Sequence, residues 1–156
     1  MKFALFHGCN IPSRVKQYAG ATAAVCARLD IELVEVTGAY SVEWTRKLDC
    51  CGAPMTGIND QLARDMTQNK IDSALEAGAQ FICTACPYSQ LQFDGVQKRM
   101  VPQPNNGAPI APILYPQLLG LSMGIDEKTL GIAQNEIDIS EITSFLMTEQ
   151  ICRKQP

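Results

Sequence analysis

Short apolar segments alternate with helical patterns along this chain, and the alternation limits the possible folds more than any other feature. Apolar runs that fit buried strands are Lys2 to Phe6, Ile31 to Val36, Ala79 to Cys83 and Ile113 to Tyr115. Strands separated by helices predict a parallel sheet with right-handed crossovers. We therefore expect an α/β domain with a small Rossmann-like parallel sheet of about four strands and flanking helices.

The first two helices are indicated by apolar spacing and by capping residues. Between Val15 and Leu29, apolar residues recur at three- and four-residue intervals and form one stripe, which includes Cys26 as a small core residue. A second helix is predicted from Asn59, a good N-cap, to a stop at Gly78. The segment between the second strand and this helix, through Trp44, is predicted to be a loop.

The second half of the chain carries three more helical patterns. One begins at Pro87, and its buried side is predicted to consist of Leu91, Val96 and Met100. After a proline-rich loop and the fourth strand, helices are expected from Gln117 to Met123 and from Ser140 to Gln150. Residues 1–150 are thus expected to form one domain, and residues 151–156 a C-terminal tail in which Cys152 is a spare thiol.

Charge and composition exclude several classes of function. The formal net charge of -3 offers no basic face for phosphates, so a nucleic-acid partner is not expected. The apolar start is too short for a signal peptide, and no later stretch is long enough to span a membrane. Seven cysteines without an export signal are typical of a reducing compartment, so we expect a cytoplasmic protein whose cysteines bind metal or act in redox chemistry.

Five of the seven cysteines form one pattern: Cys9, the adjacent pair Cys50-Cys51 followed by glycine, and the CxxC motif Cys83 to Cys86. Cys9 and Cys83 lie at the ends of predicted strands. Parallel sheets bind ligands beyond the carboxyl ends of their strands, so the fold is expected to bring these cysteines to one rim. Cys9 and Cys86 also precede predicted helix N-termini, which favour thiolates and an anionic metal-sulfur centre.

The number and arrangement of these thiols favour an iron-sulfur cluster. Such clusters are held by thiolates, usually four for an ordinary cubane. The adjacent side chains of Cys50 and Cys51 diverge, so they can reach two metals of a cluster more easily than they can chelate one ion. Zinc remains an alternative because four of the five could form an all-cysteine tetrahedral site. A thioredoxin-like thiol-disulfide oxidoreductase would explain Cys83 and Cys86 but not the other three.

Other polar residues have both functional and structural interpretations. His7 precedes Cys9 by two residues and could donate a proton beside the cluster, or could pack at the strand end. Trp44 could cover the cysteine loop or fill the core beneath it. Gln117 could contact a ligand or begin a helix. The charged residues of the second helix are read as a solvated face: Arg64, Asp65 and Lys70.

Four motifs together resemble the CCG-domain (cysteine-rich domain) family, which includes the B subunits of heterodisulfide reductases. They are Phe6 to Pro12, Cys50-Cys51-Gly52, Cys83-Thr84-Ala85-Cys86 and Leu114 to Leu121. The resemblance implies a noncubane 4Fe-4S cluster ligated by the five motif cysteines. It further implies an oxidoreductase: an iron-sulfur subunit of a heterodisulfide reductase-like complex that reduces a disulfide or oxidises thiols. The family often has proline where His7 stands.

This chain carries the motif once, whereas those B subunits carry it twice. We therefore expect a second CCG domain as a partner, from another copy of the chain or from a paralogous subunit. The resemblance also implies a ferredoxin-like iron-sulfur subunit, a flavin subunit and a small disulfide or thiol substrate. An assembly or electron-relay module with zinc or a cluster, and without catalysis of its own, is the alternative.

Overall fold

A computed structural model describes residues 2–6, 40–99 and 109–153 of the chain. In chain order the elements are β1 (Lys2–Phe6), β2 (Tyr40–Ser41), η1 (Ala53–Met55), α3 (Asp60–Glu76), β3 (Phe81–Thr84), α4 (Pro87–Leu91), the π-helical segment η2 (Gln92–Val96), α5 (Gln97–Arg99), β4 (Ala111–Leu114), α6 (Tyr115–Ser122), η4 (Ile132–Gln134) and α7 (Ser140–Arg153). Strands and helices alternate, which confirms the predicted α/β class.

The sheet has four parallel strands in the order β2-β1-β3-β4. Phe3 of β1 pairs with Phe81 of β3, and Phe81 pairs with Ala111 of β4. The carboxyl ends of all four strands therefore meet at one edge of the sheet. The short β2 lies where a loop was predicted, because its backbone pairs with β1 beside it. The predicted strand from Ile31 to Val36 and the first predicted helix lie outside the described residues.

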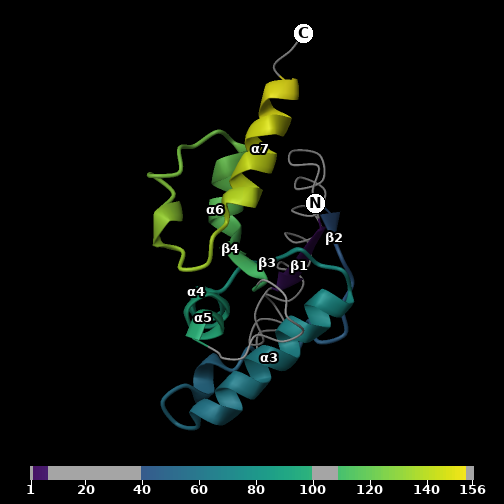
Figure 1. The fold of residues 1–156 in the computed structure, drawn as a ribbon, viewed down its shortest axis with the longest axis vertical. Coiled ribbons are helices and arrows are strands. Elements are labelled where there is room, and N and C mark those ends of the chain that lie inside the picture. Colours follow the sequence, from purple (N-terminus) through teal and green to yellow (C-terminus); the bar gives the residue numbers. More distant parts are fainter. Residues whose placement is uncertain (1, 7–39, 100–108, 154–156) are drawn as a thin grey trace, which may run out of the picture.

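Helices cover both faces of the sheet, and each face has its own apolar core. Alternate residues of a strand point to opposite faces. Phe3, Leu5 and Phe81 pack with α6 and α7 on one face, whereas Ala4 and Phe6 pack toward α3 and η2 on the other. Figure 1 shows the sheet between the α6–α7 pair and α3. The site must form at an edge, because both faces are occupied.

Helix α3 begins as the sequence predicts. The Asn59 side chain accepts a hydrogen bond from the backbone N–H of Leu62 at 3.0 Å, and thereby caps the first turn. The helix ends at Glu76, and Gly78 follows with a positive φ of 79°. Capping and the glycine stop are local interactions, which is why the sequence reveals both ends.

The helical run from Pro87 to Arg99 differs from its prediction on the buried side. Leu91 is 67% exposed, and the side buried instead consists of Ser89, Gln90, Gln92, Phe93, Asp94, Gly95 and Gln97. Two of these side chains bind backbone groups: Asp94 accepts from two amides at 2.8 and 2.7 Å, and Gln97 bonds both the N–H and the carbonyl oxygen of Ile110. A π-helical turn also shifts the facing of residues relative to a regular helix. The apolar pattern was therefore misleading here, and Met100 lies outside the described residues.

The ends of the last two helices are also shifted. Tyr115, predicted to end the fourth strand, begins α6. Gln117 caps that helix: its side chain accepts from the backbone N–H of Leu114 at 3.2 Å and donates to the carbonyl oxygen of Leu130 at 3.2 Å. Helix α7 runs to Arg153, past the predicted end at Gln150, and includes the backbone of Cys152. No helix in the described part of the chain is both long and apolar enough to cross a membrane.

Candidate cysteine site

Cys86 stands at the carboxyl edge of the sheet, between β3 and α4. It is the N-cap residue of α4, with Pro87 at the first helical position, as the sequence predicts. Its side chain is partly exposed. Two other predicted site residues, His7 and Cys9, follow β1 in the sequence and lie outside the described residues.

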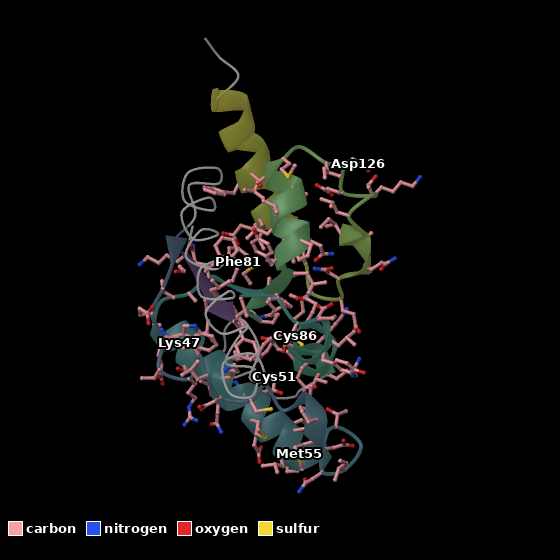
Figure 2. The ribbon with its side chains drawn as sticks, turned by 180° about the vertical axis from the view of Figure 1, so that it is seen from behind. Lys47, Cys51, Met55, Phe81, Cys86 and Asp126 are labelled. Atoms are coloured by element: carbon pink, nitrogen blue, oxygen red, sulfur yellow. The ribbon has the colours of Figure 1, made fainter. Side chains whose placement is uncertain are left out.

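The Cys50-Cys51 pair lies on a separate loop. Cys51 is 3% exposed, and Cys50 is partly exposed beside it. The Ser89 hydroxyl of α4, the helix that begins directly after Cys86, donates a hydrogen bond to the Cys51 sulfur. In Figure 2 the labelled Cys51 and Cys86 lie on the same part of the molecule, well away from Asp126. The Cys50-Cys51 loop therefore packs against the start of α4.

The Cys51 thiol lies in a crowded environment. Burial raises its pKa most, the hydrogen bonds from Ser89 and from the backbone N–H of Ala53 lower it, and the nearby charges of Cys50 and Cys86 raise it. The Ser89 hydroxyl donates to the Cys51 sulfur at 3.4 Å. Burial thus disfavours the thiolate form of Cys51, and the two hydrogen bonds oppose that effect.

Helix α3 and the π-helical segment fix the backbone of Cys51. The Thr67 hydroxyl donates to the carbonyl oxygen of Cys51 at 2.9 Å or to that of Ala63 at 2.8 Å. It accepts a hydrogen bond from the Gln92 side chain at 2.8 Å. The loop is therefore held by a buried polar network, which limits how far the two cysteines can move.

Lys70 of α3 is completely buried, so its prediction as part of a solvated face is wrong. Its ammonium donates to the carbonyl oxygens of Arg46 and, at 2.8 Å, Asp49. It also lies 3.9 Å from the ring centroid of Phe6 and 4.7 Å from that of Trp44. Carbonyl oxygens and aromatic faces both attract cations, and they compensate for lost hydration.

Trp44 fills the core beneath the loop. The residue is 5% exposed, its indole N–H donates to the carbonyl oxygen of Leu5 at 3.3 Å, and its ring meets Phe6 edge-on at 6.3 Å. Of the two readings left open by the sequence, the structure supports core packing.

Cys83 lies in a different core from Cys51. Its side chain is completely buried in the core on the α6–α7 face, among Leu5, Ile113 and Leu118. Cys51 belongs to the core on the opposite face. None of the four cysteines with described side chains is in a disulfide, and no three His, Cys, Asp or Glu residues within 2–6, 40–99 and 109–153 are arranged to hold a metal ion.

Sequence reasoning missed three residues that shape the site: Thr67, Lys70 and Ser89. A signal existed for the first two, because they are three residues apart on a helix and share a side with the apolar Ile71 and Ala74. A lysine on the apolar side of a helix indicates burial rather than solvation.

Comparison with known proteins places this site in a family. The family model described as a cysteine-rich domain, CCG, matches residues 3–94, more than half of the chain. The chain is 37% identical over 142 residues to the B subunit of the ferredoxin:CoB-CoM heterodisulfide reductase of Methanosarcina mazei, with 88% of this chain and 46% of that protein covered. The B subunit of the ferredoxin/F(420)H(2)-dependent CoB-CoM heterodisulfide reductase of Methanosarcina acetivorans matches at the same identity and coverage.

A third relative is named as a subunit of a different reductase. The 8-methylmenaquinol:fumarate reductase membrane anchor subunit of Wolinella succinogenes is 28% identical over 142 residues, covering 91% of this chain and 50% of that protein. The chain spans about half the length of each of these relatives, and all three are subunits of reductases. By its matched domain and its relatives, the chain belongs to the CCG, or cysteine-rich domain, family.

Proposed function

We propose that the chain is an iron-sulfur subunit of a heterodisulfide reductase-like complex, and that it passes electrons through its cluster to a disulfide or accepts them from thiols. The observation that supports this most is the contact of Cys51 with Ser89 of α4, which sets the Cys50-Cys51 loop against the helix that begins after Cys86 at the carboxyl edge of a parallel sheet. The proposed reaction is supported by two relatives that are named as B subunits of heterodisulfide reductases.

The donor set fits such a cluster in part. Cys50, Cys51 and Cys86 supply thiols from two loops, and Cys9 is the expected remote ligand after β1. Cys83 is the proposed fifth ligand of a noncubane 4Fe-4S cluster, the type that the family resemblance implies. When bound, the cluster would supply one-electron transfer between a donor and a sulfur substrate.

The cysteines of the proposed site differ in their exposure to solvent. Cys51 is nearly inaccessible to water, and Ser89 donates a hydrogen bond to its sulfur. Cys50 and Cys86 are more exposed, so they mark the side from which a substrate sulfur or a partner surface can approach. Hydrogen bonds to ligand sulfurs and low solvent exposure both tune the potential of iron-sulfur sites.

The proposed partners follow from the length of the relatives and from their names. Because this chain spans about half of each relative, we propose that a second CCG domain, from another copy or from a paralogous chain, completes the functional unit. Two relatives have ferredoxin in their names, which supports a ferredoxin-like electron donor, and a flavin subunit is the other proposed partner. The substrate class is a small disulfide or its thiols, and His7 is the proposed proton donor beside Cys9.

Anaerobic purification tests the metal content directly. We expect a brown, oxygen-sensitive protein with iron and sulfide near ~4 each per chain, and Cys51→Ala and Cys86→Ala should each lose most of the iron. Cys152→Ala, in the last turn of α7, is the matched cysteine control and should retain the iron. A colourless protein with one zinc per chain would reject the proposal.

The iron content of a Cys83 variant distinguishes a five-thiolate cluster from a four-thiolate one. A five-thiolate noncubane cluster requires Cys83→Ala to lose iron as Cys86→Ala does. Retention of iron would leave Cys9, Cys50, Cys51 and Cys86 as four ligands, the number an ordinary cubane uses. Electron paramagnetic resonance with and without a disulfide then tests turnover, since a signal that substrate does not change would indicate electron relay only.

A further inference from the structure

A buried lysine beneath the cysteine loop is the least expected charge in the described part of the chain. Lysine is almost never fully buried without partners, because removing an ammonium from water costs several kcal/mol. Lys70 is nevertheless 0% exposed, and its ammonium is surrounded by two backbone carbonyl oxygens and two aromatic faces. Such an enclosure costs stability, so a specific role is the natural explanation.

Lys70 belongs to a row of polar side chains that hold the loop leading to Cys51. The row consists of three residues of α3: Thr67, Lys70 and Ser73. The Ser73 hydroxyl shares a hydrogen bond with that of Thr45 at 3.0 Å and accepts from the backbone N–H of Arg46 at 3.3 Å. Lys70 binds the next carbonyls, at Arg46 and Asp49, and Thr67 reaches the carbonyl of Cys51. One helix thus fixes the segment at its start, middle and end.

The charge of Lys70 is buried, whereas the charges of the turn that it contacts are exposed. Arg46 and Asp49 pair with each other at 2.9 Å, with side chains 50% and 52% exposed, and Lys47 pairs with Glu43 in solvent. Exposed charges are screened by water and salt, whereas a buried charge acts at a lower effective dielectric. Lys70 of α3 donates to the backbone carbonyl of Asp49, the residue before Cys50, so it is a buried charge in direct contact with the segment that carries the cysteine pair.

We infer that Lys70 is a positioning residue of the cysteine site: it holds the turn that carries Cys50 and Cys51, and it keeps a positive charge beside the anionic cluster. This inference rests on the proposed function. A fixed positive charge favours the state with the extra electron, so it raises the reduction potential of a neighbouring centre. By Coulomb's law, a unit charge roughly 10 Å from a redox centre, in a medium of effective dielectric constant about 20, changes the reduction equilibrium about tenfold.

A redox titration of the purified full-length protein, followed by electron paramagnetic resonance, tests the charge. We expect Lys70→Met to lower the equilibrium constant for one-electron reduction about tenfold, which corresponds to a potential ~59 mV more negative. Lys47→Met removes the same charge from the exposed side of the same turn and should leave the potential close to wild type. Equal shifts in the two variants, or none in Lys70→Met, would overturn the role of the charge.

Hydrogen exchange of the as-purified chains tests the positioning without relying on the cluster. Backbone amides of residues 46–51 should exchange faster in Lys70→Met than in wild type or Lys47→Met, and unchanged exchange would overturn the positioning role. If Lys70→Met does not fold, Lys70→Gln keeps a hydrogen-bond donor and removes the charge, and the same two outcomes apply to it. A wild-type chain without iron would reject the proposed function and the charge role together, while exchange would still decide the positioning role.

Discussion

Gly52, which follows Cys50 and Cys51, occupies a position where a side chain has no room. Its φ is +94°, in the region that residues with a Cβ rarely adopt. A Cβ placed there would lie 2.4 Å from the carbonyl oxygen of Ala63 and 3.2 Å from the hydroxyl oxygen of Thr67. Ala63 contributes backbone of α3, which does not rotate away as a flexible side chain can. We therefore expect Gly52→Ala to force the cysteine loop away from the helix.

The expected destabilisation has two parts. Placing alanine in a left-handed conformation costs about 1–2 kcal/mol. Forcing an extra methyl group into packed surroundings costs typically ~1–3 kcal/mol more. Gly57→Ala provides a matched control, because Gly57 also has a positive φ, +81°, but nothing lies within 4 Å of its Cβ position. We thus expect about 2–5 kcal/mol for Gly52→Ala and about 1–2 kcal/mol for Gly57→Ala.

Urea unfolding of the two variants and the wild type measures both free energies of unfolding on one scale. The difference between the two free energies of unfolding measures the cost of the steric clash between the Gly52→Ala side chain and α3. Iron content gives a second readout, since a displaced loop should lower it in Gly52→Ala and not in Gly57→Ala. A Gly52→Ala variant as stable as Gly57→Ala would refute the reasoning that the loop is clamped against the helix.

Three further predictions concern a hydrogen bond, a cap and a surface carboxylate. Ser89→Ala removes the donor to the Cys51 sulfur and should raise the pKa of that thiol further in the metal-free chain, measured from thiolate absorbance; an unchanged pKa would argue against this bond. Asn59→Ala should cost α3 its cap and ~1 kcal/mol of unfolding free energy in urea, and a loss near zero would contradict the capping. Hydrogen bonds from Thr129 lower the pKa of Asp126 below its ordinary value of 3.8, so the carboxylate stabilises the fold above that value and this contribution is lost as pH falls through the folded pKa. Acid titration of unfolding should therefore show a weaker pH dependence for Asp126→Asn than for wild type, and identical curves would count against it.

Local patterns in the sequence were sufficient for much of the architecture. The alternation of apolar runs and helices predicted the parallel sheet, Asn59 and Gly78 marked the ends of α3, and Pro87 placed Cys86 at the start of a helix. Each of these features depends on residues a few positions apart, whose backbone preferences and capping groups act within one element. The same local logic failed for Leu91, because long-range polar contacts, not apolar spacing, decide which side of that helix is buried.

The sequence by itself determined that five cysteines follow strands and turns in a pattern suited to a metal-sulfur site. Only the tertiary structure decided how they pack: Cys51 contacts the helix that begins after Cys86, whereas Cys83 lies in the core on the other face of the sheet. It also decided that Lys70 is enclosed beneath their loop. The physical reason is that the facing of a strand residue and the burial of a charge depend on the elements that pack from both sides, which spacing along one chain does not specify.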